Sequence, residues 1–152
     1  MIVVDSREKK NLHILKYFET HNIDYIVQKM DVADYQIKGC ESLVIDRKQN
    51  LDELSRNLTN RSDHARFWKE VRRANGSGIK LIILCEHGGQ IKSIPDVAKW
   101  HSKYSPVSGR ALMEEIYRVH IAYGVEFIFC EKWQTAQLIL ELLKGEKHTT
   151  VI

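Results

Sequence analysis

One apolar run constrains the fold of this chain more than any other segment. Residues 80–85 read K-L-I-I-L-C, so every position after Lys80 is apolar. A short run without alternation is typical of a strand buried on both faces, and it predicts helices on each side of a sheet. The segment 75–78 before it, N-G-S-G, is the clearest chain breaker in the sequence. We therefore expect an α/β protein with this strand near the centre of its sheet.

The other patterns arrange elements around this strand. β-branched and alternating residues predict five further strands, at 2–4, 24–30, 33–38, 43–47 and 125–130. Apolar residues at helical spacing predict five helices, at 9–22, 50–57, 63–74, 108–123 and 133–144. Ser108 is expected to cap the fourth helix and Gly124 to end it. The order β-α-β-β-β-α-α-β-α-β-α predicts a central mixed sheet flanked by helices, antiparallel near its start.

The length and charge of the chain bound its class. A chain of 152 residues fits one domain, and we expect a single domain over 1–145 followed by a flexible tail over 146–152. The formal net charge of +3 permits a nucleic-acid partner without requiring one. No apolar stretch approaches the roughly 18 residues of a membrane span, so no membrane association is expected.

The cysteines indicate a compartment. Cys40, Cys85 and Cys130 are odd in number and widely spaced, which argues against a zinc knuckle and against a disulfide framework. Unpaired thiols at the ends of buried strands fit a reducing environment. We expect an intracellular protein, cytoplasmic or nucleoid-associated, or nuclear in a eukaryote.

Acidic residues stand at the ends of several predicted strands. Asp5 closes the first strand, Asp34 opens a hairpin, and Asp46 and Lys48 close it. Because side chains alternate along a strand, Asp46 and Lys48 share one face and Arg47 points the other way. Carboxylates can hold a hard divalent cation, and an ammonium group can contact the attacking water and the scissile phosphate. The pattern predicts a site that hydrolyses a phosphodiester.

Each charged residue also has a plain structural interpretation. Charges at a strand end often form a solvated rim, and Asp52 in the next helix could complement the helix N-terminus, add a metal ligand or orient Lys48. Likewise Arg66, Lys69 and Arg73 share a helix face by spacing, which fits either solvent or the backbone of DNA. The joint pattern of an acid-ended strand and a hairpin closed by D-x-K favours a site over a rim.

At these residues the chain resembles the nuclease domain of the XPF-type structure-specific endonucleases, a branch of the PD-(D/E)xK nucleases. The family pattern is Gly-Asp, a variable gap, Glu-Arg-Lys, three residues and Asp, with an earlier Asp followed by Arg-Glu at the first strand. The corresponding segments here are Ala33-Asp34, Asp46-Arg47-Lys48, Asp52 and Asp5-Ser6-Arg7-Glu8. The likeness continues through Arg61, Arg66-Phe67, the strand ending at Glu86 and the segments 108–112 and 131–143. It therefore covers nearly the whole chain.

The resemblance implies a restriction-endonuclease-like fold, dependence on Mg²⁺ or Mn²⁺, action on branched or junction DNA, and a homodimer formed by the last helices and strand. It implies that the metal is bound by Asp5, Asp34 and Asp46, and that Lys48 positions the water and stabilises the transition state. The residues it implies as supports of the site are Glu8, Arg47 and Asp52. Those it implies as contacts of the DNA backbone are Arg7, Arg61 and Arg66.

Two positions depart from the family pattern. Ala33 replaces the glycine before Asp34, and Asp46 replaces a glutamate and is one methylene shorter. These departures leave open a non-catalytic DNA-binding or dimerisation module of the same fold. A second alternative is a junction-resolvase or restriction-type PD-(D/E)xK nuclease. Because the acids and Lys48 are retained, we favour an active metal-dependent endonuclease.

Overall fold

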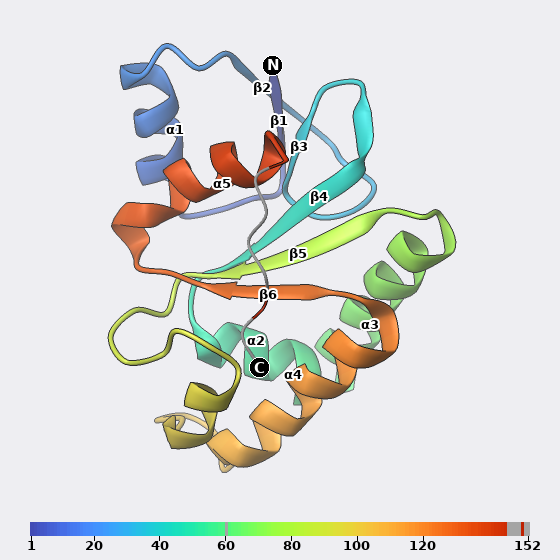
Figure 1. The fold of residues 1–152 in the computed structure, drawn as a ribbon, viewed down its shortest axis with the longest axis vertical. Coiled ribbons are helices and arrows are strands. Elements are labelled where there is room, and N and C mark those ends of the chain that lie inside the picture. Colours follow the sequence, from blue (N-terminus) through green and yellow to red (C-terminus); the bar gives the residue numbers. More distant parts are fainter. Residues whose placement is uncertain (60, 146–149, 151–152) are drawn as a thin grey trace.

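One mixed sheet with helices on both faces forms the framework of the molecule (Figure 1). The computed structural model describes residues 1–59, 61–145 and 150, with only the backbone of residues 61–63. Within this part of the chain, the strands in spatial order are β2 (Tyr25–Gln28), β1 (Ile2–Asp5), β3 (Tyr35–Ile37), β4 (Cys40–Lys48), β5 (Lys80–Cys85) and β6 (Glu126–Phe129).

The strand directions confirm the predicted mixed sheet. β3 is antiparallel to both β1 and β4, whereas the pairs β1–β2, β4–β5 and β5–β6 are parallel. Every residue of β5 after Lys80 is buried, as expected for a strand covered on both faces. The antiparallel part lies near the start of the chain, where the hairpin was predicted.

Two separate apolar cores hold the helices to the sheet. On one face lie α2 (Leu51–Thr59), α3 (Arg61–Gly76) and α4 (Gly109–Tyr123), and on the other lie α1 (Leu12–Thr20) and α5 (Thr135–Leu143) (Figure 1). Two short 3-10 helices, η1 (Pro95–Lys99) and η2 (Lys132–Gln134), precede α4 and α5. Val44 of β4 belongs to the first core and Ile45 to the second. Successive residues of β4 therefore face different helix layers.

The expected helix ends are present in α4. The side chain of Ser108 accepts a hydrogen bond from the Ala111 N–H at 3.1 Å, and Gly124 ends the helix with a φ of +66°. These contacts satisfy backbone groups that a helix terminus leaves without partners. No helix in the described part of the chain is long and apolar enough to cross a membrane.

The tail predicted for residues 146–152 lies, apart from Thr150, outside the described residues. Thr150 is buried against β6, where its Oγ1 accepts a hydrogen bond from the Phe127 N–H at 2.9 Å. The domain boundary at residue 145 stays a prediction.

Gly109 provides a test of the packing between η1 and α4. A Cβ atom at this position would lie 2.3 Å from the carbonyl oxygen of Trp100 and 2.4 Å from that of Val97. Because backbone atoms cannot move aside cheaply, we expect Gly109→Ala to lower the free energy of unfolding by about 2 kcal/mol or more, measured by urea denaturation. The control is Gly76→Ala, where a Cβ meets nothing within 4 Å and stability should change little. Equal effects of the two substitutions would contradict the packing.

Candidate active site

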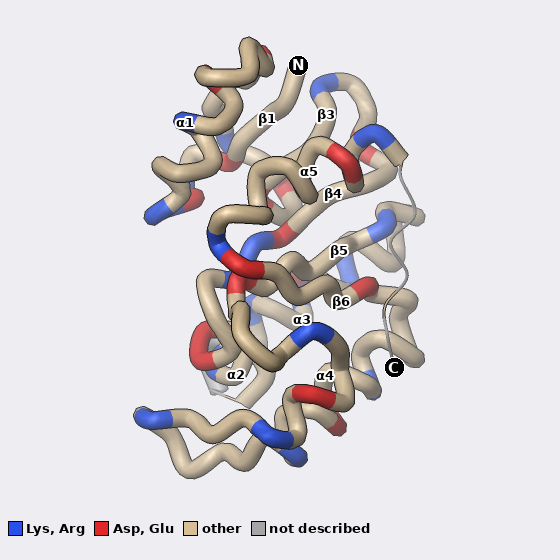
Figure 2. Tube along the Cα trace, turned by 60° about the vertical axis from the view of Figure 1, so that its left-hand side comes forward, with Lys and Arg blue, Asp and Glu red and all other residues tan. Residues whose placement is uncertain are grey.

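Three neighbouring strands bring acids from distant parts of the sequence together. The Asp34 N–H donates to the Ile45 carbonyl at 2.9 Å, and the Asp34 carbonyl accepts from the Asp5 N–H at 2.8 Å. Asp5, Asp34 and Asp46 therefore lie on adjacent strands β1, β3 and β4, or at their ends. Figure 2 shows acidic and basic segments next to each other along β4. The alternation seen at Val44 places Asp46 on the face covered by α2 and α3.

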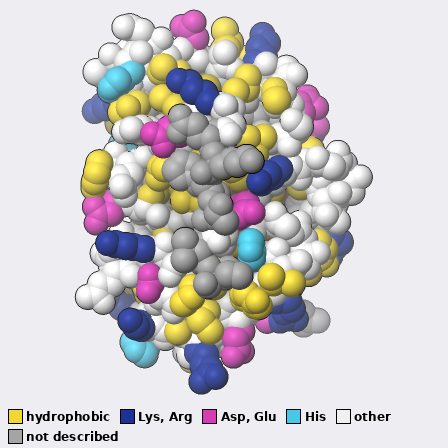
Figure 3. Space-filling view, viewed as in Figure 1, with side chains coloured by type: hydrophobic (Ala, Val, Ile, Leu, Met, Phe, Trp, Pro, Cys, Tyr) yellow, Lys and Arg dark blue, Asp and Glu magenta, His cyan; other side chains and the backbone are white. Residues whose placement is uncertain are grey.

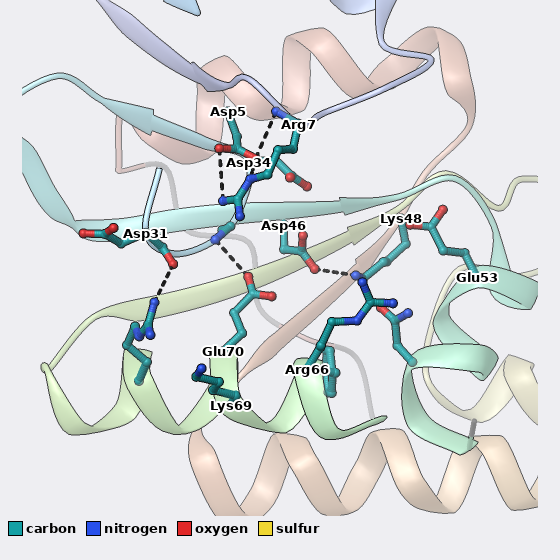
Figure 4. Close-up of a pocket in the computed structure, with 14 residues that line it drawn as sticks. Asp5, Arg7, Asp31, Asp34, Asp46, Lys48, Glu53, Arg66, Lys69 and Glu70 are labelled. Atoms are coloured by element: carbon teal, nitrogen blue, oxygen red, sulfur yellow. Dashed lines mark hydrogen bonds and ion pairs between the residues drawn. The ribbon is translucent and has the colours of Figure 1, made fainter. Parts of the chain in front are cut away.

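These side chains line a cavity of about 430 Å³ between the sheet and α3 (Figure 4). Charged groups dominate its wall. The lining residues are Asp5, Arg7, Asp31, Ala33, Asp34, Asp46, Lys48, Glu53, Asn57, Arg66, Phe67, Lys69, Glu70 and Arg73. The structure thus gathers the predicted acids, Lys48 and the predicted basic face of α3 around one space.

Asp46 and Lys48 form a buried ion pair. Both residues are less than 10% exposed, and Lys48 Nζ lies 2.7 Å from Asp46 Oδ2. Among the described residues this oxygen accepts no hydrogen bond of regular geometry, so the charge of Lys48 is what offsets its burial. Burial lowers the pKa of Lys48, but the nearby Asp46 carboxylate outweighs it and the net pKa is raised. Lys48 is therefore a fixed positive charge.

Asp34 is held so that its carboxylate faces Asp46. Its Oδ2 accepts a hydrogen bond from the Arg47 N–H at 2.8 Å. Burial, followed by the charge of Asp46, raises the pKa of Asp34 well above its ordinary value. Two carboxylates this close tend to share a proton or a cation.

Asp5 is engaged by other groups in this structure. Its Oδ2 accepts from Arg7 Nε at 3.0 Å, and its Oδ1 accepts from the Met30 N–H at 2.8 Å. No three His, Cys, Asp or Glu side chains in the described residues already stand in an arrangement that would hold a metal. The predicted ligands Asp5, Asp34 and Asp46 thus line one cavity, with Asp5 held by Arg7 and Asp46 turned toward Lys48.

Three further acids at the cavity, Asp31, Glu53 and Glu70, escaped the sequence analysis. Glu70 Oε1 accepts a hydrogen bond from the Ala33 N–H at 2.9 Å, and burial, followed by the charge of Asp46, raises the pKa of Glu70 to about 8. Glu53 Oε2 accepts from the Gln49 N–H at 3.1 Å. The spacing of Arg66, Lys69 and Arg73 could have indicated Glu70, which lies one turn after Arg66 on the same helix.

Arg47 enters the opposite side of the sheet and is buried in a network of acids. Its guanidinium donates to both oxygens of Glu8, at 2.6 and 2.9 Å, and also contacts Glu86 and the carbonyl of Lys9. Burial lowers the pKa of Arg47, but Glu8 and Glu86 outweigh it and the net pKa is raised. The Tyr35 hydroxyl donates to Glu8 at 2.7 Å. The guanidinium network fixes the end of β4 on the face of α1 and α5. The backbone N–H of Arg47 holds Asp34 at the cavity.

The remaining predicted residues divide between the cavity and other places. Arg7 and Arg66 line the cavity. Asp52 points elsewhere, because its Oδ1 accepts a hydrogen bond from the Ser102 hydroxyl at 2.7 Å. The side chain of Arg61 lies outside the described residues. The roles of these residues stay predictions.

The mixed sheet with helices on both faces is the α/β architecture expected from the sequence. Comparison with known proteins then gives the family: the ERCC4 domain matches residues 4–143. The chain belongs to the ERCC4 domain family and has the XPF-type nuclease fold.

Two solved structures show the same fold. XPF from Aeropyrum pernix superposes with a TM-score of 0.71, and the same protein in complex with DNA superposes with a TM-score of 0.70, both at 17% sequence identity. The matches cover 94% of this chain and 63% and 62% of those chains. The chain therefore spans less than two thirds of the length of either relative. No curated protein matches it by sequence.

The acids fit a hard divalent cation by their chemistry. All candidate ligands are carboxylates, which Mg²⁺ and Mn²⁺ prefer. Burial, followed by the charge of Asp46, raises the pKa of Asp34, and a cation between the two carboxylates would offset both effects. Asp34 and Asp46 are the residues best placed to hold a cation, with Asp5 beside them.

The raised pKa of Glu70 predicts how stability depends on pH without metal. Its pKa of about 8 lies above the ordinary value of 4.5, so between these values the folded chain binds more protons than the unfolded chain. The contribution of Glu70 to stability is then greatest below the lower value and is lost as pH rises through about 8. We expect the loss from Glu70 to be at most about 4 kcal/mol between pH 5 and 8.5 in EDTA.

Urea denaturation of Glu70→Gln at several pH values measures how much Glu70 contributes to the pH dependence of stability, because the amide cannot ionise. The slope of stability against pH should flatten in this variant and should persist in the control Glu19→Gln, which changes an exposed acid of α1. An unchanged slope in Glu70→Gln would show that another group carries it.

Proposed function

We propose that this domain is a divalent-metal-dependent endodeoxyribonuclease that hydrolyses phosphodiesters in branched, flap or junction DNA. The observation that carries the proposal is the convergence of Asp34, Asp46 and the buried Lys48 in one charged cavity. Membership of the ERCC4 domain family supports nuclease chemistry. The arrangement also fits what phosphodiester hydrolysis needs, because it places carboxylates and a fixed cation beside one cavity.

In the proposed reaction each polar group of the cavity has one task. Asp34 and Asp46 hold Mg²⁺ or Mn²⁺, with Asp5 as the third ligand. The bound ion would activate a water and polarise the phosphoryl oxygens. The Lys48 ammonium, fixed by Asp46, orients the attacking water and offsets the charge that develops on the phosphate. Because Lys48 stays protonated, it acts as a cation and not as a base.

The basic side chains around the cavity are suited to hold the DNA backbone. Arg66 and Lys69 extend from α3 at the cavity, with Arg7 across from them (Figure 4), and Arg73 of the same helix also lines it. Guanidinium and ammonium groups in such a row bind phosphates without reading sequence. This suits an enzyme that recognises the shape of its DNA. The relative solved with DNA supports a DNA partner for the fold. Arg61 is proposed as a further contact.

Cleavage assays test the proposal directly. Labelled fork, flap, four-way junction and linear duplex DNA are incubated with the native protein and Mn²⁺ or Mg²⁺, with EDTA as the metal-free control. Asp46→Asn keeps the shape of the ligand but removes its charge, and Lys48→Met removes the buried cation. We expect each to reduce cleavage by at least about 100-fold. Asp24→Asn, the same change at an exposed acid outside the cavity, should leave cleavage unchanged.

The outcomes separate the alternatives. No cleavage of any DNA by the native protein, together with binding of branched DNA, would favour a non-catalytic module of the same fold. A preference for linear duplex would favour a restriction-type nuclease, and cleavage confined to four-way junctions a junction resolvase. Cleavage that persists in Asp46→Asn would remove this cavity from the mechanism.

We also propose that the domain forms a homodimer through α4 and its surroundings. Tyr117 and Ile121 lie one turn apart on α4 and are 45% and 59% exposed. Figure 3 shows hydrophobic side chains grouped over α4 in the lower part of this face. Exposed apolar side chains that lie together are typical of an interface. A two-fold dimer would present two cavities to a branched substrate.

Light scattering after gel filtration measures the oligomeric state. We expect a dimer that Ile121→Asp converts to a monomer, because the substitution buries a charge in the interface. Leu12→Asp changes another exposed apolar residue, on α1, and should leave the dimer intact. A native monomer at micromolar concentration would contradict this part of the proposal.

A further inference from the structure

The segment that leads into Asp34 has a backbone conformation that favours glycine. Ala33 has a φ of +64°, in the left-handed region, and is only 8% exposed. A residue with a Cβ atom is disfavoured there relative to glycine. A contact from elsewhere in the fold that favours this conformation would offset the disadvantage.

Two side chains of α3 hold this segment by its backbone. Glu70 Oε1 accepts a hydrogen bond from the Ala33 N–H at 2.9 Å, and Arg73 Nη1 donates to the Asp31 carbonyl at 3.1 Å (Figure 4). Residues three apart share a helix face, so one side of α3 clamps both ends of the segment 31–33. Phe67, one turn earlier, is 2% exposed and belongs to the same core as Ala33, which keeps the helix against the segment.

Asp34 itself is held by the sheet. Its N–H and carbonyl pair with the Ile45 carbonyl and the Asp5 N–H, and its carboxylate accepts from the Arg47 N–H. Ala33, one residue earlier, lies before β3 and has its N–H bonded to a side chain in place of a strand partner. The direction in which the chain enters Asp34 therefore depends on the turn at Ala33.

We propose that Glu70 is a positioning residue for Asp34. By accepting the Ala33 N–H it keeps the left-handed turn in place, and so it permits an alanine at a position whose backbone favours glycine. Glu70 acts here through the backbone of Ala33 and not on the DNA. The inference rests on the proposed nuclease function, because the position of Asp34 matters for the metal and the scissile phosphate.

Four variants distinguish the effects of the hydrogen-bond acceptor of Glu70, the charge of Glu70 and the left-handed turn at Ala33. Glu70→Gln keeps an oxygen that can accept the N–H, so cleavage should stay within about threefold of the native rate. Glu70→Ala removes the acceptor and should reduce cleavage about 10- to 100-fold through displacement of Asp34. Ala33→Gly alone should change cleavage little. Added to Glu70→Ala, it should restore about fivefold, because glycine adopts the turn without the clamp.

Two readouts do not depend on cleavage. Amide hydrogen exchange at Ala33, followed by NMR, should be slow in the native protein and in Glu70→Gln and at least about tenfold faster in Glu70→Ala. The affinity for Mn²⁺, measured by titration of the free-ion EPR signal, should fall in Glu70→Ala and recover in part with Ala33→Gly. Glu19→Ala removes an exposed acid that also accepts one hydrogen bond, from Tyr25, and should change neither readout.

The proposed function and this inference can fail separately. If the native protein cleaves no DNA, the exchange and Mn²⁺ measurements still decide the role of Glu70. The inference is overturned if Glu70→Ala leaves the Ala33 amide protected and the Mn²⁺ affinity unchanged. It is also overturned if Glu70→Gln is as damaging as Glu70→Ala, since charge and not the hydrogen bond would then matter.

Discussion

The alternation of side chains along β4 organises the whole site. Val44, Asp46 and Lys48 face α2 and α3, whereas Ile45 and Arg47 face α1 and α5. A slip of β4 by one residue would exchange the two sets and bury Asp46 and Lys48 among the partners of Arg47. The apolar residues of the same strand prevent this, because each fits only one core. The packing that holds the sheet together therefore also decides which charges enter the cavity.

The buried charges on the two faces of β4 are stabilised to different extents. Arg47 is 3% exposed, and its guanidinium is surrounded by acceptors from Glu8, Glu86 and Lys9. Loss of one partner from such a buried pair typically costs about 3–5 kcal/mol, so the network ties β1, β4 and β5 together. In the cavity the balance is reversed: several acids surround Lys48, and the pKa of neighbouring acids rises. The proposed cation would offset this excess of negative charge.

Much of the fold could be predicted because its signals are local. The order of the strands and α-helices followed from the period of the apolar residues, whereas the 3-10 helices η1 and η2 were not predicted. Ser108 and Gly124 marked the ends of α4 through capping chemistry. The placement of Asp46 and Lys48 on one face followed from strand geometry alone. The convergence of Asp34 with Asp46 needed only the expected hairpin, which pairs β3 with β4.

Other parts of the site depend on packing between distant segments. Nothing local showed that Glu70 would reach the Ala33 N–H, because this contact requires α3 to lie across the end of β3. Nor did the sequence show that Asp52 would bond to Ser102, fifty residues away, or that Asp5 would be held by Arg7 and Met30. Such contacts depend on the angle at which helices cross the sheet, and this angle is set by all side chains at the interface together.

By itself the sequence determined the order of strands and α-helices and the faces of β4, and it predicted candidate residues for binding a metal and phosphates. These features depend on residue type and on spacing over a few positions along the chain. Only the tertiary structure decided which acids share the cavity, that Glu70 joins them and that Ala33 adopts a left-handed turn beside Asp34. The physical reason is that burial and neighbouring charges control these groups, and both arise only when the helices pack on the sheet.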